Sequence, residues 1–349
     1  MKPVKRLLFL AIALILLVAA CSGGGAEPAA DTPEPEAAPV TETDEGEEAA
    51  EPAAEEEAAA EGERPLVKLV TNPWSASELN VAVAGILLEE ELGYPVEVVS
   101  LDENAQWTAL ASGDVHASLE VWPSGHVANV EQYIDDLGVV EHGGPLGPIG
   151  KIGWYVPSYV VEAQPELATW EGFLGEEAAA LFATAETGDQ GQFIGGDPSF
   201  VQYDQDIIDN LGMDFEVVYA GSEEAILSQL DAAYSREEPV LFYFWTPHSV
   251  HAQYELTEVE LPAYSDECYA EADAGSVECD YPADELYKIF WADFDEYAPE
   301  AHQLLTNMNY TTEDQIGMIA AVELEGQSVE EAAREWLEAN ESTWQSWLP

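Results

Sequence analysis

Basic residues are scarce in this sequence. Its 349 residues include nine lysines and arginines against 70 aspartates and glutamates, and the formal net charge at pH 7 is −61. A protein of this charge repels phosphate-rich surfaces, so nucleic acid and anionic lipid surfaces are excluded as binding partners. An acid-rich, lysine-poor composition also suggests a salty, halophilic habitat, because at about 1 M salt the repulsion between charges reaches only a few ångströms.

Cysteine and the sequence signatures of catalysis are also scarce. The chain has three cysteines and no Cys-x-x-Cys, His-Glu-x-x-His or Gly-x-Ser-x-Gly motif, so neither a metal centre nor an activated serine is indicated. The glycine-rich segment 143–150 contains Pro145 and Pro148, which lack the N–H groups that a phosphate-binding loop needs. We therefore expect no metal, no cofactor and no enzymatic activity. The remaining enzyme alternative is a glycosidase with paired carboxylates, but no such pair stands out.

The first 64 residues have the pattern of a targeting signal followed by a linker. Residues 1–20 combine three basic residues with an apolar run, and small residues precede Cys21, which is typical of a bacterial lipoprotein signal peptide. A permanent transmembrane anchor is the alternative, but the run is shorter than the roughly 20 residues that a span needs. Residues 21–64 are mostly small, proline or acidic, which predicts a disordered acidic tether. The protein should therefore be extracytoplasmic and held at the cell membrane by a lipid on Cys21.

The other two cysteines, Cys268 and Cys279, lie in an acidic stretch. Outside the cytoplasm, two cysteines this close in sequence predict a disulfide, which for a loop of this size contributes about 3 kcal/mol to stability. The acidic residues between them could instead hold calcium, but their spacing is not that of an EF-hand loop. A solvated acidic loop closed by a disulfide is the simpler interpretation.

From residue 65 onward, strand-like and helix-like segments alternate. This alternation predicts α/β architecture with largely parallel sheets. One helix should begin at Ser75, because Ser75 and Glu78 have the spacing of a capping box. From about Tyr281 to its end the chain should be mainly helical. The expected strands cover residues 66–71, 96–101, 115–121, 151–156, 192–196, 215–220 and 240–245, and the expected helices cover residues 75–92, 107–111, 127–137, 166–182, 203–211 and 222–234.

Four aromatic residues lie near prolines where predicted strands end. They are Trp74, Trp122, Phe200 and Trp245, and ligands collect at the carboxyl ends of parallel strands. Core packing would explain a single such ring, but four at equivalent places favour a cage of aromatic faces around a small cation. A quaternary ammonium group suits such a cage because it has no N–H donors. At about 2 kcal/mol per ring, three or four rings approach the roughly 8 kcal/mol of a micromolar complex.

Several stretches also carry a family resemblance. The segments ALASGDVHASLEVWPSGH, PVLFYFWTPH and SVEEAAREWLEANESTWQSWL resemble the substrate-binding proteins of ABC importers for glycine betaine, proline betaine and choline. The resemblance covers residues 66–349. It implies a two-lobed periplasmic-binding-protein fold of type II, in which two α/β lobes joined by a hinge close on a ligand in the cleft. Lobe I would comprise residues 65–153 and 257–349, and lobe II residues 154–256.

The resemblance assigns roles to the four aromatic residues. Trp122 and Trp245 should form walls of the cage, and Phe200 stands where the glycine betaine branch usually has a tryptophan. Trp74 matches a cage aromatic of the choline branch. The acidic residue that follows this aromatic in the choline branch is absent here, which favours a betaine over choline.

The polar end of the expected site follows from the same resemblance. The backbone N–H groups of Val201 and Gln202, together with His126, correspond to the family's carboxylate site near a helix start. Trp154 or Tyr155 could add a further ring, although packing is the better explanation of either residue.

Together these features predict an extracytoplasmic solute-binding lipoprotein. We expect it to capture a quaternary ammonium osmolyte, with glycine betaine as the first expectation, and to deliver it to an ABC permease. Choline or another compatible solute is the alternative ligand. A sensory or adhesive binding lobe is the alternative function.

Overall fold

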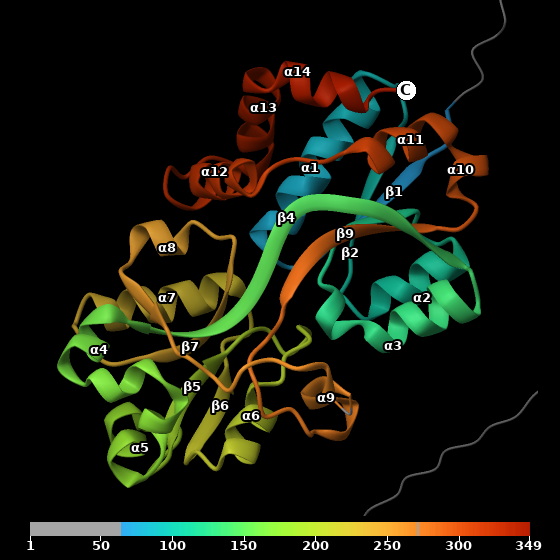
Figure 1. Cartoon of the computed structure of the whole chain (residues 1–349). Helices are drawn as coiled ribbons and strands as arrows, with labels where there is room; N and C mark the ends of the chain where they lie inside the picture. The colour runs from blue at the N-terminus through green and yellow to red at the C-terminus, as the bar shows by residue number, and fades with distance from the viewer. Residues whose placement is uncertain (1–63, 271) are drawn as a thin grey trace, which may run out of the picture. The chain divides into compact units, whose positions relative to one another are not determined.

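The computed structural model describes residues 64–270 and 272–349. The predicted signal peptide, Cys21 and the tether up to residue 63 lie outside this part of the chain. Within it, strands and helices alternate along most of the sequence, so the predicted α/β class is confirmed (Figure 1).

One sheet contains all nine strands found in the described residues. The strand order is β2-β1-β3-β9-β4-β7-β5-β6, and β8 pairs with β4 outside this series. The strands are β1 (Val67–Thr71), β2 (Val96–Ser100), β3 (Ala117–Val121), β4 (Val140–Pro157), β5 (Gly191–Gly195), β6 (Phe215–Tyr219), β7 (Leu241–Thr246), β8 (Leu256–Glu258) and β9 (Ala283–Trp291).

Two groups of parallel strands are linked by two long antiparallel ones. Strand β1 runs parallel to β2 and β3, and β5 runs parallel to β6 and β7. Between the groups, β9 is antiparallel to β3 and β4, and β4 is antiparallel to β7. Figure 1 shows β4 and β9 side by side, with β4 passing from one group to the other. The prediction of largely parallel sheets is therefore correct for each group and wrong for the strands that join them.

From about Tyr281 the chain is mainly helical, as predicted, but strand β9 is an exception that the sequence analysis did not predict. Three charged residues interrupt its apolar pattern, so its sequence does not look like a central strand. One of them, Lys288, is fully buried, and its Nζ donates to the backbone carbonyls of Thr306 and Met308. Burial without an acidic partner lowers the pKa of Lys288 to about 7. A buried lysine satisfied by carbonyl groups explains how this charged segment enters the sheet.

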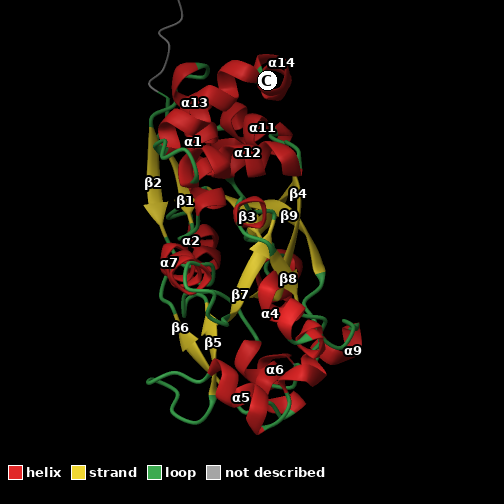
Figure 2. Ribbon diagram, turned by 90° about the vertical axis from the view of Figure 1, so that its left-hand side faces the viewer, coloured by secondary structure: helices red, strands yellow, loops and turns green. Residues whose placement is uncertain are grey.

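In the part of the chain that the structure describes, two groups of helices lie apart from each other, and other helices lie between them. In Figure 2, α1 lies with α11 to α14 at one end, and α5 and α6 lie at the other. No helix in the described ranges is long and apolar enough to cross a lipid bilayer. The helices are α1 (Ser75–Glu90), α2 (Ala105–Ser112), α3 (Val127–Asn129), α4 (Ser158–Ala163), α5 (Glu176–Phe182), α6 (Asp204–Leu211), α7 (Glu223–Tyr234), α8 (Val250–Gln253), α9 (Asp266–Tyr269), α10 (Phe294–Tyr297), α11 (Pro299–Asn307), α12 (Thr312–Glu323), α13 (Val329–Ala339) and α14 (Glu341–Trp344).

The start of α1 differs from the predicted capping box. Its N-cap residue is Trp74, and no side chain caps the helix there. The backbone N–H of Ser75 instead donates to Glu223 at 2.8 Å, and the Ser75 hydroxyl donates to Glu323 at 2.8 Å. A carboxylate from α7 thus satisfies the helix terminus that Glu78 was expected to help cap.

Cys268, in α9, and Cys279 form a disulfide that joins this short helix to the segment before β9.

Candidate functional site

The four strand-end aromatic residues meet at one pocket. Trp74 follows β1, Trp122 follows β3, Phe200 follows β5, and Trp245 lies near the end of β7. All four line the same small cavity. Seven of the twelve lining residues are aromatic, because Tyr203, Tyr243 and Tyr281 join the four predicted ones.

Phe200 connects two of the predicted cage walls. Its ring meets Trp74 edge to face at a centroid distance of 5.6 Å, and it meets Trp245 in the same way at 6.1 Å. Phe244 stacks on the indole of Trp245, with centroids 4.4 Å apart and planes within 4°. Edge-to-face and stacked contacts of this kind fix the planes of the rings. Within this structure these contacts therefore fix how the rings of this wall face one another.

A buried carboxylate holds the indole rings of Trp74 and Trp122 in place. Glu120 is almost fully buried and accepts hydrogen bonds from the indole N–H groups of Trp74 at 2.8 Å and Trp122 at 3.1 Å. The amides of Asn80, at 2.6 Å, and Gln315, at 3.1 Å, supply two more donors. Burial raises the pKa of Glu120 to about 7, although these four hydrogen bonds oppose the rise. Glu120 thus orients two cage rings from outside the pocket.

Gly150 leaves the space that Trp122 needs against β4. A Cβ atom at this position would lie 2.4 Å from a ring carbon of Trp122, well inside van der Waals contact. The last glycine of the segment 143–150 therefore has a packing role, because it allows the backbone of β4 to lie against a cage tryptophan.

The polar end of the pocket contains a residue that the sequence analysis did not identify. Glu103, between β2 and α2, accepts the backbone N–H of Val201, and its other oxygen lies 3.2 Å from Nε2 of His126. The Asn129 amide lies 3.1 Å from Nδ1 of His126 and donates to it, which leaves the imidazole proton on Nε2, facing Glu103. The structure therefore brings two of the predicted carboxylate-binding donors together around a carboxylate of the protein itself.

Gln202 takes a different position from the other predicted residues. It is not among the residues that line the pocket. Its side-chain oxygen accepts the N–H of Gly196 at 3.0 Å, and its amide donates to the carbonyl of Asp197 at 2.7 Å. Gln202 therefore braces the turn that carries Phe200.

Trp154 and Tyr155 lie outside the lining, as packing would require. Trp154 is fully buried, packs against Phe193 and donates its indole N–H to Asp204 at 2.6 Å. Tyr155 packs against His251, with ring centroids 4.9 Å apart. The interpretation of these two residues as core residues is confirmed.

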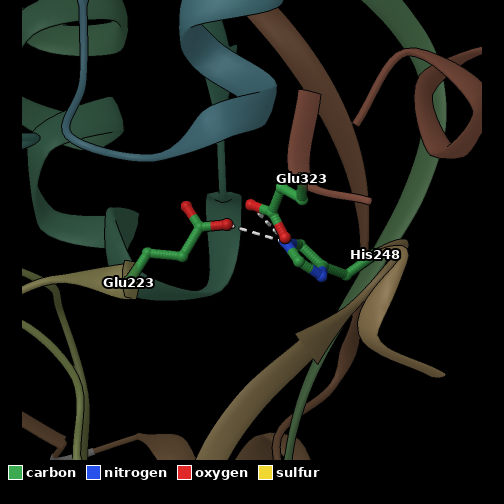
Figure 3. Close-up of side chains that lie close together, drawn as sticks. All are labelled: Glu223, His248 and Glu323. Carbon is green, nitrogen blue, oxygen red and sulfur yellow. Dashed lines mark hydrogen bonds and ion pairs between the residues drawn. The ribbon is translucent and has the colours of Figure 1, made fainter. Parts of the chain in front are cut away.

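A second cluster of polar residues lies behind the aromatic pocket (Figure 3). Glu223 at the start of α7 and Glu323 at the end of α12 both face the His248 ring. The His248 Nε2 is 2.6 Å from Glu223 and 3.5 Å from Glu323. Through the two Ser75 hydrogen bonds, the cluster also reaches the residue next to Trp74. It therefore connects the segments that carry Trp74 and Trp245.

The same cluster is the candidate metal site among the described residues, since its three ligand atoms lie within 4.8 Å of one another. A metal-binding imidazole must leave the ligating nitrogen unprotonated and donate from the other nitrogen. Here the Val250 N–H points at Nδ1 of His248 at 3.1 Å, so Nδ1 acts as an acceptor. Burial opposes the charged form of His248, but the hydrogen bonds and charges of the two carboxylates outweigh it and raise the pKa to about 9. The Val250 contact fits the neutral ring with its proton on Nε2, and protonation would add a proton at Nδ1; in both forms Nε2 is protonated, so the geometry favours a hydrogen-bonded cluster over a metal site.

Comparison with known proteins identifies the family. Residues 65–339 match the family described as the substrate-binding domain of ABC-type glycine betaine transport systems. The chain belongs to this family. Its members are solute-binding components of importers rather than enzymes, and they work outside the cytoplasm, in agreement with both predictions. The chain is 29% identical over 295 residues to the trimethylamine N-oxide-binding protein of Pelagibacter ubique (strain HTCC1062). The alignment covers 82% of this chain and 91% of that protein.

Two solved structures share the fold. Lactococcal OpuAC, closed on glycine betaine, has a TM-score of 0.64 and 20% identity, with 82% of this chain and all of that chain covered. An ABC-transporter choline-binding protein in complex with choline has a TM-score of 0.65 and 21% identity, with 81% and 92% covered. The predicted two-lobed periplasmic-binding-protein fold is therefore confirmed. Similarity at this level of identity concerns the fold and not the ligand.

Three residues of the site beyond the predicted set, two in the lining and one behind it, had signals in the sequence. Tyr243 lies two positions before Trp245, and residues two apart in a strand share a face. Glu120 likewise precedes Trp122 by two positions in a strand whose other residues are uncharged. Glu103 follows the predicted strand 96–101 and so lies at the same kind of strand end as the cage aromatics.

Proposed function

We propose that this protein captures a small solute with a methylated ammonium group in its aromatic pocket and delivers it to an ABC permease. The observation that carries the proposal is the ring of aromatic side chains around one small cavity. Aromatic faces attract a cation that is shielded from water, at about 2 kcal/mol per desolvated face. The ligands named for the three similar proteins, glycine betaine, choline and trimethylamine N-oxide, share a nitrogen bearing three methyl groups.

In this proposal Trp74, Trp122, Phe200 and Trp245 are the cage walls. Glu120 and the contacts of Phe244 hold three of these rings without the help of a ligand. Rings that are already oriented within each lobe save part of the cost of ordering side chains on binding, which supports high affinity for a small ligand.

The proposal includes the placement of the protein. Residues 1–20 would act as a lipoprotein signal peptide, and a lipid on Cys21 would anchor the acidic tether 21–64 to the membrane. In this proposal lobe I comprises residues 65–153 and 257–349, and lobe II comprises residues 154–256. The Cys268–Cys279 disulfide supports an oxidising, extracytoplasmic location.

Calorimetric titration with tetramethylammonium tests the cage directly, because this ion has no polar end. We expect measurable binding that weakens at least about tenfold in Trp122→Ala and Trp245→Ala, since each removes one ring face. Trp170→Ala, which truncates a partly buried tryptophan outside the pocket, is the matched control and should bind as the native protein does. Absence of binding by tetramethylammonium and by every methylated ammonium solute at millimolar concentration would refute the proposal.

A further inference from the structure

The donors expected to bind a ligand carboxylate are occupied by the protein. Glu103 lines the pocket and is buried. It accepts the Val201 N–H with one oxygen, and its other oxygen faces the protonated Nε2 of His126. A ligand carboxylate would therefore have to compete with Glu103 for both donors.

Other donors of the lining residues also point at buried carboxylates. The indole N–H groups of Trp74 and Trp122 donate to Glu120. The Ser124 hydroxyl donates to Asp284 at 2.7 Å, and the Tyr281 hydroxyl donates to Asp204 at 2.9 Å. No lysine or arginine is among the pocket-lining residues of the described chain. The pocket is therefore surrounded by acidic groups and offers no cationic partner to an anion.

The carboxylate of Glu103 has opposite effects on ligands that carry a carboxylate and ligands that carry a hydroxyl group. A carboxylate placed at hydrogen-bonding range of Glu103 is repelled, and the repulsion is strong where aromatic walls exclude water. A hydroxyl group is favoured, because it can donate to Glu103. A carboxylate has about four acceptor positions, so each oxygen of Glu103 can accept a second hydrogen bond while keeping the one it has.

Resting on the function proposed above, we infer that the preferred ligand is a methylated ammonium cation with a hydroxyl group, a choline-like amino alcohol, and that Glu103 selects it over zwitterionic betaines. The hydroxyl donates to Glu103, and the Glu103 carboxylate complements the net positive charge of the ligand. This reverses the order of ligands expected from the residue after Trp74.

Calorimetry on the full-length protein tests the inference with four probes: choline, glycine betaine, trimethylamine N-oxide and tetramethylammonium. We expect choline to bind at least about tenfold more tightly than glycine betaine, because a hydrogen bond to a charged group is gained in one case and lost in the other. Trimethylamine N-oxide, whose oxygen can only accept, should also bind more weakly than choline. Equal or tighter binding of either neutral ligand would overturn the inference.

The variant Glu103→Gln separates selection from support of the fold. It keeps the size of the side chain and removes its charge, so choline should weaken by about tenfold to a hundredfold while glycine betaine is unchanged or strengthened. Glu103→Asp, which keeps the charge, should keep the preference for choline. Glu97→Gln, on the exposed side of β2, is the control for loss of one negative charge and should leave both affinities unchanged.

The outcomes distinguish this inference from the proposed function. If tetramethylammonium binds but glycine betaine exceeds choline, the cage stands and the role of Glu103 is wrong. If none of the four probes binds, the proposed function itself fails. If Glu103→Gln weakens choline and glycine betaine equally, Glu103 supports the pocket without selecting the ligand, and the inference is overturned. The ranking of ligands by the native protein does not depend on whether any variant folds.

Discussion

The aromatic and polar ends of the pocket are held in place by different means. At the aromatic end, rings contact other rings, and Glu120 receives two indole N–H groups from behind the wall. At the polar end, Glu103, His126 and Val201 come from three separate connections and meet through hydrogen bonds. Packed rings offer every ligand the same surface, whereas a hydrogen-bonded carboxylate responds to what the ligand carries. The first end should therefore set affinity in general, and the second should set the choice between ligands.

The largest expected effect comes from breaking the support of the aromatic end. Glu120→Leu leaves four buried donors without an acceptor, and each unpaired donor costs about 1 to 3 kcal/mol. We expect the free energy of unfolding to fall by at least about 4 kcal/mol in denaturant titrations, with binding of all ligands lost together. Glu120→Gln keeps one acceptor oxygen and should lose less. A Glu120→Leu protein with native stability and normal binding would contradict the role given to Glu120.

The pH dependence of stability is the next effect and also arises at the aromatic end. Burial raises the folded-state pKa of Glu120 from 4.5 to about 7, so between these values the native state holds a proton that the unfolded chain has released. Stability should therefore fall as pH rises from 4.5 to about 7, by about 1.4 kcal/mol per pH unit for this group where the difference is one full proton. Its contribution is fully present below pH 4.5.

Asp204 and Asp284, with pKa values raised by burial to about 7 and about 6, add to the same slope in the same direction. The measurement is chemical unfolding at a series of pH values. Glu120→Gln lacks the titrating group and should show a shallower decline than the native protein. Parallel profiles for the two proteins would show that Glu120 does not titrate in this range.

A smaller effect follows from filling the space under Trp122. Gly150→Ala places a methyl group where ring carbons already lie, and overpacking of this kind costs about 1 to 3 kcal/mol. Choline, glycine betaine and tetramethylammonium should all bind more weakly by a similar factor in calorimetry. Gly317→Ala is the matched control, because no neighbouring atom lies within 4 Å in α12 and alanine there should stabilise the helix by about 0.5 to 1 kcal/mol.

The smallest expected effect sharpens the polar end. His126→Ala removes one of the two donors that position Glu103, so choline affinity should fall by about fivefold to tenfold with little change for tetramethylammonium. If His126 instead contacted a ligand carboxylate, the same variant would weaken glycine betaine and leave choline unchanged. Calorimetry with the three ligands therefore decides which partner His126 serves.

The ends of the pocket also differed in how far the sequence could predict them. Each cage aromatic has a local signal, since a strand pattern and a nearby proline place Trp122 or Trp245 at a strand end without knowledge of the fold. Glu103 lies among polar residues in a short connection, and only its meeting with Val201, 98 positions away, gives it a role. Contacts of this range depend on the order of strands in the sheet, which the amino-acid pattern did not reveal.

The strands of the sheet also differ in how far the local sequence predicts them. The parallel strands were predictable because they are short apolar runs next to helices. Strand β9 was not predictable, because a lysine such as Lys288 is expected at the surface. Its burial depends on the carbonyls of Thr306 and Met308, which accept its hydrogen bonds. Ser75 was likewise assigned to a local capping box, whereas Glu223, 148 positions away, receives its N–H. In each case a distant partner determines the outcome that local propensity alone does not.

The cluster of Glu223, His248 and Glu323 has a consequence for how such a protein changes over evolutionary time. Through Ser75 and His248 it joins the neighbours of Trp74 and Trp245, so the spacing of two rings depends on side chains that never touch the solute. A descendant could widen its pocket for a bulkier cation by shortening one of these carboxylates, leaving every lining residue intact. Relatives with identical cages could then differ in the size of solute they accept, and a comparison of their lining residues alone would not reveal it.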